Sequence, residues 1–435
     1  MYFVAPKNSE TNGGTCMHEQ QTRKTVDTII IGVEKQQDVD FSYSMKELTN
    51  LTEALDLRTV AQVSQKLTVP NQATYIGSGK VSEIKMMCEE MDVSLVIFND
   101  ELTPSQIRNL EKLLEVTVYD RTMLILDIFG ERAKTKEAQM QVEVARLKYL
   151  LPRLVGMRAS LSRQGGSGTG LANRGAGETK LELDRRKIES RINMLEKELE
   201  SIVNRRDIQR SQRKKQQMPV VALIGYTNAG KSSLLNAMLT DDQEKHVFEK
   251  DMLFATLDTS VRRVEWKKNL PFLMADTVGF VSKLPTHLVK AFRSTLEEAR
   301  EADLLLHVVD YSHEYYKEMI ETTTETLKSM DIEQPMVFVY NKIDLTDENE
   351  PRTQANELFV SASKKLGLNL LADAIQASIF KEYRVQNLLI PYDEGAVQAR
   401  INEQTHVIKQ EEREEGWFIK AFFNEQDRLA FERFL

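Results

Sequence analysis

The chain has 435 residues, too many for a single hydrophobic core, so we expect about three or four domains. Its two cysteines, Cys16 and Cys88, lie far apart without metal-ligand spacing, which argues against a disulfide framework or structural zinc. The net charge of −8 gives no general attraction to nucleic acid; we expect no DNA partner, and any RNA contact would need a local basic surface. Apolar runs are too short to span a membrane and no signal peptide is evident, which predicts a cytoplasmic protein.

The first part of the chain alternates between strand and helix patterns. Residues 1–22 are polar and aperiodic, and we expect a disordered tail there. Residues 23–135 are predicted to form an α/β domain with a small parallel sheet. Its expected strands are 26–31, 60–64, 95–98 and 116–119, and its expected helices are 45–55, 81–91 and 103–114. A glycine segment at Gly77–Lys80 lacks phosphate-loop spacing and better fits a tight turn before a helix.

Residues 136–215 have the pattern of two helices that pack along a seam. Apolar residues recur at alternating spacings of four and three, which predicts an antiparallel helical hairpin. The seam residues are Met140, Val144, Leu147, Leu151 and Leu154 on one helix, and Ile188, Ile192, Leu195, Leu199 and Ile202 on the other.

The expected loop of this hairpin, residues 156–178, is rich in glycine. Between Gly156 and Gly177 it carries Arg158, Arg163 and Arg174 and no acidic residue. A flexible linker is one interpretation. A basic arm tip that probes the phosphates of structured RNA is the other. The basic run 205–215 is interpreted as a solvated linker before the next domain.

A phosphate-binding loop follows a short apolar strand, Val220–Ile224. The loop and the start of the next helix fit G-x-x-x-x-G-K-[ST], in which backbone N–H groups and a helix N-terminus surround phosphates. Lys231 is expected to reach the β- and γ-phosphates, and the Ser232 hydroxyl to bind Mg²⁺. The nucleotide-binding residues expected here are Gly225, Tyr226, Thr227, Asn228, Ala229, Gly230, Lys231, Ser232 and Ser233.

Two further segments have the pattern of nucleotide switches. Thr256 fits a segment that closes on Mg²⁺ and the γ-phosphate. The strand 271–275 ends in Asp276-Thr277-Val278-Gly279, which places an Mg²⁺-supporting carboxylate at Asp276 and a γ-phosphate-sensing N–H at Gly279. We therefore expect Lys231, Thr256 and Gly279 to act in catalysis, and Ser232, Thr256 and Asp276 to hold the metal.

The base of the nucleotide is predicted to be guanine. The segment Asn341-Lys342-Ile343-Asp344 follows a buried strand, and the Asp344 carboxylate can accept from guanine N1–H and its exocyclic amine, a donor pair that adenine lacks. Lys342 is expected to cover the base plane and Asn341 to join this segment to the phosphate loop. Backbone N–H groups of Ser361, Ala362 and Ser363 are available to guanine O6.

Three motifs each lie at a strand end: the phosphate loop, Asp276-Thr277-Val278-Gly279 and Asn341-Lys342-Ile343-Asp344. Together they resemble the motifs of translation-factor-type GTPases. Residue Phe280 departs from Ras-like proteins, in which a glutamine after the glycine orients the attacking water. A phenylalanine ring cannot bond to water, so we hypothesise slow intrinsic hydrolysis that a partner stimulates. A second interpretation is that Phe280 simply packs within a mobile switch, and both interpretations can hold.

One further segment is more specific than the nucleotide motifs: Arg174-Gly175-Ala176-Gly177-Glu178-Thr179-Lys180-Leu181-Glu182. It resembles the signature of the HflX family of ribosome-associated GTPases, and the resemblance covers nearly all of the chain from about Thr25. Family members bind the large ribosomal subunit through its rRNA and proteins, and in the GTP state they split stalled or stress-inactivated ribosomes. The resemblance places the arm tip near the peptidyl-transferase region.

The expected fold is α/β and multidomain. It combines an N-terminal α/β domain with a helical hairpin, a P-loop GTPase domain with a mostly parallel doubly wound sheet over residues 216–382, and a small α+β domain over residues 383–435. We expect a monomeric, Mg²⁺-dependent enzyme that converts GTP to GDP and phosphate. The alternative is a large-subunit assembly or dormancy factor that binds rRNA without splitting ribosomes; a transient membrane association is left open.

Overall fold

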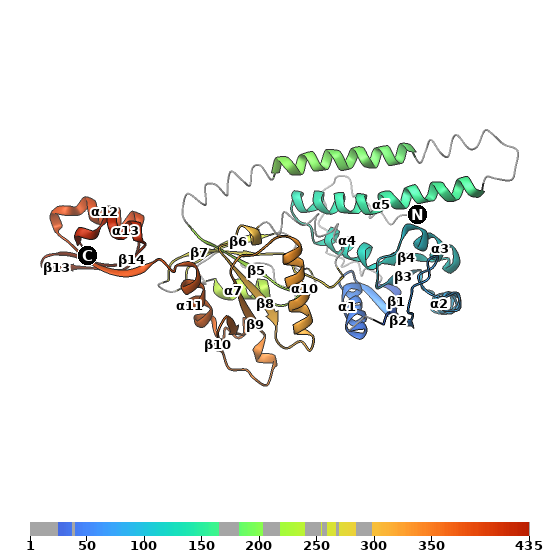
Figure 1. Ribbon diagram of the computed structural model, residues 1–435, viewed down its shortest axis with the longest axis horizontal. Coiled ribbons are helices and arrows are strands. Elements are labelled where there is room, and N and C mark those ends of the chain that lie inside the picture. The colour runs from blue at the N-terminus through green and yellow to red at the C-terminus, as the bar shows by residue number, and fades with distance from the viewer. Residues whose placement is uncertain are drawn as a thin grey trace, which may run out of the picture.

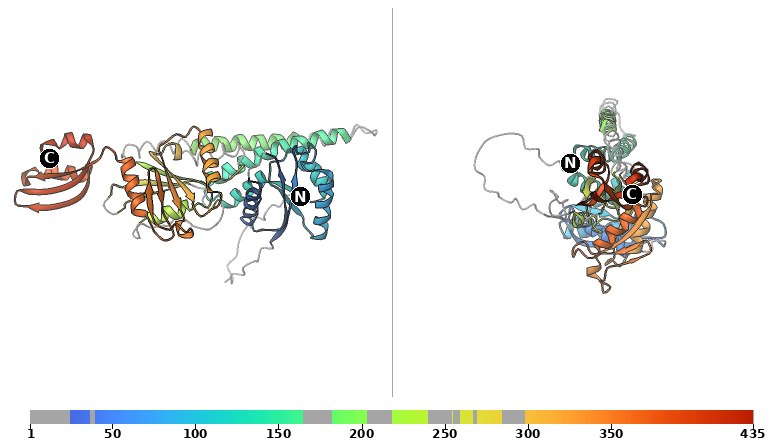
Figure 2. Two further views of the ribbon diagram at one scale, coloured as in Figure 1. Left: turned by 60° about the horizontal axis from the view of Figure 1, so that its bottom comes forward. Right: turned by 90° about the vertical axis from the view of Figure 1, so that its left-hand side faces the viewer.

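The computed structural model describes residues 25–36, 40–164, 182–202, 218–239, 254, 259–266, 269–283 and 298–434, with the side chains of residues 154–164 left out. Three globular units lie in a row, and two long helices lie along one side of the N-terminal and middle units (Figures 1 and 2). The middle unit carries the nucleotide motifs, so both neighbouring units can contact it.

The N-terminal domain is a four-stranded sheet whose strands are all parallel, in the order β2-β1-β3-β4. Alternate residues of β1 face opposite helix layers: Ile30 packs with α1 and α4, whereas Ile29 and Ile31 pack with α2 and α3. Its strands are β1 (Val26–Glu34), β2 (Leu57–Lys66), β3 (Leu95–Phe98) and β4 (Thr117–Asp120). Its helices are α1 (Phe41–Glu53), α2 (Ser78–Glu90), α3 (Pro104–Leu114) and α4 (Arg121–Arg132).

This domain confirms the predicted parallel sheet and its three predicted helices, and it adds α4, which the sequence pattern did not reveal. Helix α3 begins with a capping box: Thr103 accepts from the Gln106 N–H, and the Gln106 side chain accepts from the Thr103 N–H. The segment at Gly77 precedes α2, as expected for a turn before a helix.

The helical hairpin is also confirmed. Helix α5 (Lys136–Gln164) packs against a helix over residues 182–202. Between them lie eight of the predicted seam residues: Met140, Val144, Leu147, Ile188, Ile192, Leu195, Leu199 and Ile202. Arg191 of the second helix pairs with Glu143 of α5 at 2.8 Å. One expectation was wrong, because α5 continues through Gly156 to Gln164 where a loop from residue 156 was predicted. The glycine-rich segment 165–181 and the basic run 203–217 lie outside the described residues.

The nucleotide domain is built on a seven-stranded sheet in the order β10-β11-β9-β8-β5-β7-β6. Strands β5, β7, β8, β9 and β11 are parallel, and the two edge strands β6 and β10 run antiparallel to their neighbours. The strands are β5 (Val220–Ile224), β6 (Ser260–Val264), β7 (Phe272–Asp276), β8 (Leu304–Asp310), β9 (Met336–Asn341), β10 (Arg352–Gln354) and β11 (Glu357–Phe359). The helices are α7 (Lys231–Met238), α10 (Tyr316–Ser329), η1 (Ile343–Leu345) and α11 (Leu368–Ile379). The phosphate loop follows β5, the Asp276–Gly279 segment ends β7 and the Asn341–Asp344 segment ends β9. The carboxyl ends of parallel strands are where open α/β sheets bind ligands.

The C-terminal domain is a three-stranded antiparallel sheet with helices on one face. Its elements are β12 (Arg384–Ile390), η2 (Tyr392–Glu394), α12 (Gly395–Gln404), β13 (His406–Arg413), β14 (Gly416–Phe423), α13 (Glu425–Ala430) and η3 (Glu432–Phe434). Helix α13 ends at Ala430, and the short helix η3 follows it.

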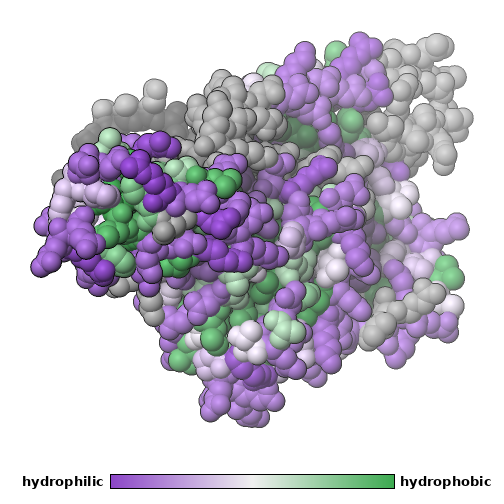
Figure 3. All heavy atoms as spheres, turned by 60° about the vertical axis from the view of Figure 1, so that its left-hand side comes forward, coloured by the Kyte–Doolittle hydropathy of each residue, from purple (hydrophilic) through white to green (hydrophobic). Residues whose placement is uncertain are grey.

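The face of the molecule in Figure 3 is mainly hydrophilic, with hydrophobic atoms gathered in small areas. Among the described residues, no helix combines the length and apolar character needed to cross a bilayer.

Candidate nucleotide site and its contact with the N-terminal domain

The phosphate loop is shaped by glycines that no other residue could replace without a clash. Gly225 has φ +141°, and a Cβ added there would lie 2.1 Å from the carbonyl oxygen of Val308. Gly230 has φ +89°, and its Cβ would lie 2.3 Å from Asn341 Nδ2. Both residues therefore need the freedom of glycine, and the loop retains a concave backbone that an anion can enter.

Lys231 lies beneath this loop with its side chain turned back onto it. Its Nζ donates to the carbonyl oxygens of Gly225 at 3.1 Å and Tyr226 at 2.8 Å. Burial lowers the pKa of Lys231 to about 8, and the nearby Asp276 carboxylate opposes that shift. A phosphate in this position would supply the negative charge that favours the protonated ammonium.

The expected metal ligands Ser232 and Asp276 are in contact. Ser232 Oγ donates to Asp276 Oδ2 at 2.6 Å, and the Asp276 side chain is fully buried at the end of β7. Oxygen donors of this kind suit Mg²⁺, so the residues present fit the expected ion. The third expected ligand, Thr256, lies outside the described residues.

The segment after β7 lies directly on the phosphate loop. A Cβ on Gly279 would lie 2.6 Å from Thr227 Cα, so the two backbones are as close as glycine allows. Thr277 is buried and donates to the carbonyl oxygen of Leu223 at 2.6 Å, which joins β7 to β5. Val278 is buried in the hydrophobic cluster between the domains.

On the base side, Asn341 joins the motifs as expected. Its Nδ2 donates to the Ala229 carbonyl oxygen at 3.0 Å, and its Oδ1 accepts from the Ala362 N–H at 3.0 Å. The Asp344 carboxylate accepts from the hydroxyls of Ser361 and Ser363, the latter at 3.2 Å. One side chain thus ties the phosphate loop to both predicted guanine segments, and two serines orient the carboxylate that would read the base.

Phe280 is packed between the domains and does not face water. Its side chain is 3% exposed, and its backbone forms a bridge with the phosphate loop: Phe280 N donates to Gly225 O at 3.1 Å, and Thr227 N donates to Phe280 O at 2.7 Å. The packing interpretation of this residue is therefore confirmed.

Sequence reasoning missed a buried polar cluster where the N-terminal domain meets the phosphate loop. We call Glu47, Arg121, Tyr226 and Ser282 the interdomain polar cluster. Glu47 of α1 accepts hydrogen bonds from the Tyr226 hydroxyl, the Ser282 hydroxyl and Arg121 Nη2. Arg121 Nη2 also reaches Ser282 Oγ at 3.0 Å, and the Ser282 N–H donates to the Tyr226 hydroxyl at 2.6 Å.

Tyr226 is expected to line the nucleotide site through the backbone of the phosphate loop, and its side chain points into this cluster. Burial, and then the Glu47 carboxylate, raise the pKa of Tyr226 well above its ordinary value, so the hydroxyl stays protonated and donates. No local sequence pattern could have indicated the cluster, because its members come from parts of the chain far apart.

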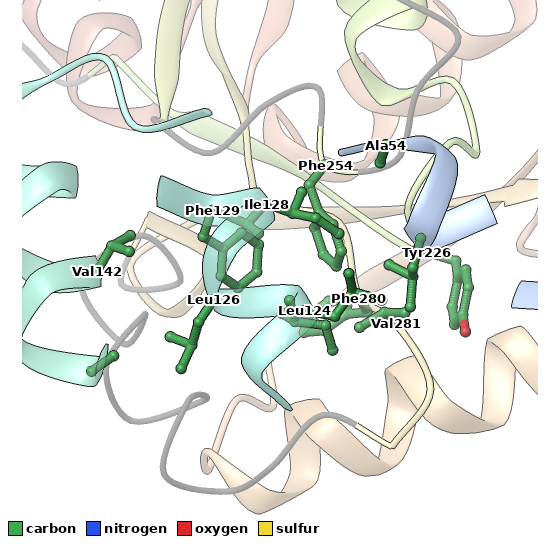
Figure 4. Close-up of a cluster of buried hydrophobic side chains, with 14 of the residues drawn as sticks. Ala54, Leu124, Leu126, Ile128, Phe129, Val142, Tyr226, Phe254, Phe280 and Val281 are labelled. Atoms are coloured by element: carbon green, nitrogen blue, oxygen red, sulfur yellow. The ribbon is translucent and has the colours of Figure 1, made fainter. Parts of the chain in front are cut away.

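Aromatic residues extend the same contact (Figure 4). Phe254 is 1% exposed, its N–H donates to Thr227 Oγ1 at 2.8 Å, and its ring meets that of Phe129 edge-on with centroids 4.6 Å apart. Leu124, Phe280 and Val281 belong to the same hydrophobic cluster. The N-terminal domain therefore contacts the phosphate loop, Phe254 and the segment 280–282 after β7.

Comparison with known proteins finds relatives for most of the chain. Three family models match consecutive parts of the chain: the N-terminal part of a GTP-binding GTPase over residues 42–130, its middle region over residues 132–213, and a 50S ribosome-binding GTPase over residues 220–342. A GTP-binding protein from Sulfolobus solfataricus, solved in complex with GDP, is 25% identical with a TM-score of 0.41, covering 82% of this chain and 99% of that chain.

Relatives named GTPase HflX match along most of their length. The one from Caldanaerobacter subterraneus subsp. tengcongensis is 44% identical over 409 residues, which cover 94% of this chain and 93% of the relative. The one from Escherichia coli is 37% identical over 395 residues, covering 89% and 91%. The chain belongs to the HflX family of GTPases.

Proposed function

We propose that this GTPase binds the large ribosomal subunit in its GTP-bound state and splits stalled or stress-inactivated ribosomes into subunits. The observation that carries the proposal is the buried contact between the N-terminal domain and the switch segment 280–283. A γ-phosphate that draws the Gly279 N–H toward it must also act on Phe280 and Ser282, which are held by that domain.

We assign the site residues the following roles. Lys231 would hold the β- and γ-phosphates, and the N–H of Gly279, together with Thr256, would respond to the γ-phosphate. Mg²⁺ held by Ser232, Thr256 and Asp276 would neutralise phosphate charge when bound. On the base side, Asn341, Lys342 and Asp344 with Ser361, Ala362 and Ser363 would select guanine.

Hydrolysis is proposed to be slow without the ribosome. The Phe280 ring is buried between the domains and offers no hydrogen bond to an attacking water. Stimulation by the ribosome would then release the protein from its partner. The helical hairpin would carry the basic segment 156–178 to the large subunit, and this segment would contact rRNA phosphates.

Sedimentation of intact ribosomes tests the proposal. Ribosomes are mixed with the protein and a non-hydrolysable GTP analogue, with GDP in a parallel sample. We expect conversion to free subunits only with the analogue. Binding to free large subunits without splitting would favour the assembly or dormancy factor, and no ribosome binding with either nucleotide would overturn the proposed partner.

A further inference from the structure

A carboxylate at the end of β8, Asp310, has no role in the motifs described above. Its Oδ2 accepts from Lys342 Nζ at 2.8 Å, and both side chains are largely buried, at 24% exposed for Lys342 and 14% for Asp310. Lys342 belongs to the segment expected to cover the guanine plane. The ion pair therefore fixes the end of a side chain whose stem would form one wall of the base site.

Asp310 itself is held firmly. Its Oδ1 accepts from the Ser312 N–H at 3.1 Å and from the Ser312 hydroxyl at 2.6 Å. Strands β8 and β9 pair Asp310 with Asn341, and the Tyr311 N–H donates to the Asn341 carbonyl oxygen at 2.9 Å. The residue whose carboxylate holds Lys342 thus lies in the strand that pairs with the start of the guanine segment.

The loop after Asp310 is fixed by aromatic packing. The ring of Tyr43 on α1 lies 4.9 Å from that of Tyr315 and 5.5 Å from that of His313. Ser312, which holds Asp310, precedes these rings directly. The loop is therefore preorganised by residues that lie outside the nucleotide site.

The position of Lys342 explains why its side chain must be held at Nζ. Its backbone has φ +66°, and a Cβ on Gly230 would lie 4.0 Å from Lys342 Cε, so the stem runs beside the phosphate loop. A free lysine side chain would sample many rotamers, whereas one held at Nζ keeps its methylene groups in one place.

We propose that Asp310 is a positioning residue for guanine-nucleotide binding and acts by holding the Lys342 stem over the base. This proposal concerns nucleotide binding alone, so an experiment that tests it gives the same answer whether or not the protein splits ribosomes. It would act on GDP and GTP alike, because both carry the same base.

The test is Asp310→Asn, which keeps the shape and removes the charge. We expect the Kd values for GDP and GTP to rise together by about tenfold, the lower end of what one charge-assisted hydrogen bond contributes. The release of fluorescent GDP, followed by stopped flow, should accelerate by a similar factor. In steady-state hydrolysis KM should rise while kcat at saturating GTP stays within about twofold.

A double-mutant cycle separates positioning from a general structural role. Lys342→Met keeps the stem but cannot pair, so adding Asp310→Asn to it should raise the Kd no further. The matched control is Glu348→Gln, which breaks another ion pair of the same domain, with Arg352 at 2.6 Å, and should leave the Kd unchanged. Unchanged GDP binding by Asp310→Asn, or additive effects in the cycle, would overturn the proposal.

Discussion

Replacing Glu47 by glutamine should loosen the switch segment from the N-terminal domain. Glu47 is 4% exposed and Arg121 is 2% exposed, so solvent screens their interaction very little. The change removes the only acidic partner that Arg121 has among the described residues, and it replaces one of the two acceptor oxygens of Glu47 by a donor. Breaking a buried pair by removing one partner costs about 3–5 kcal/mol, or roughly a factor of 150–4,000 in the equilibrium between closed and open contact.

Hydrogen exchange at the Ser282 amide measures this effect locally, which matters because a chain of several domains has no single unfolding free energy. The Ser282 N–H donates to the Tyr226 hydroxyl, so its protection reports directly on the cluster. We expect this protection to fall by roughly two orders of magnitude or to vanish in Glu47→Gln. The control is Glu53→Gln, an exposed position on the same helix, which should change nothing.

A paired variant sharpens the test. Glu47→Leu combined with Arg121→Met leaves no buried charge, so it should cost less than Arg121→Met or Glu47→Leu alone. If Glu47→Gln leaves Ser282 as protected as in the wild type, the cluster does not hold the switch segment, and the reasoning is refuted.

Three further predictions concern the nucleotide site and its sheet. Phe280→Gln should not raise the basal GTPase rate, because position 280 points into the interdomain core; a faster variant would show that the side chain can turn toward the phosphates. Gly230→Ala should abolish GDP binding in calorimetry, because its Cβ would meet Asn341, whereas the control Gly79→Ala meets nothing within 4 Å and should bind normally. His307 is 1% exposed and its pKa is lowered to about 4 by burial and then by Lys231. The unfolded nucleotide domain therefore binds the extra proton, and the stability of this domain decreases as the pH falls: relative to His307→Leu, the wild type should lose about 2 kcal/mol between pH 7 and pH 5, measured by hydrogen exchange of the amides of β8, and a difference independent of pH would contradict this.

Most elements were predictable because the residue types within each element indicate its burial or its backbone geometry. Strand β1 could be read from consecutive apolar residues, since both faces of a central parallel strand are buried. The phosphate loop could be read because backbone geometry demands glycine at Gly225 and Gly230, which leaves a mark in the sequence whatever surrounds it. The contact of Asn341 with Ala229 was expected because both motifs follow the carboxyl ends of parallel strands at the same edge of the sheet, with β8 between β5 and β9.

Helix α4 was missed for an opposite reason. Its residues Leu124, Ile125, Leu126, Ile128 and Phe129 are all buried, so no polar face alternates with an apolar one. Hydrophobic periodicity identifies a helix that has one solvent-exposed face. Helix α4 lacks such a face because it lies between its own sheet and the nucleotide domain. The extension of α5 to Gln164 was missed because Pro152 and Gly156 favour an early end to a helix that nevertheless continues through both.

The same burial of α4 on both sides suggests how a signal could leave the nucleotide site. Phe254 packs on Phe129, and Phe129 shares one hydrophobic cluster with Val142 of α5 (Figure 4). Close-packed interiors do not deform gradually, so a movement of the segments around the phosphate loop must either break these contacts or carry α4 and α5 with it. Breaking them exposes two phenylalanine rings, which opposes separation of the domains. We therefore expect nucleotide exchange to reorient the helical hairpin as a unit, and a distance between probes on α5 and α11 should differ between the GDP and GTP-analogue states; an identical distance in both would mean that the two domains respond independently.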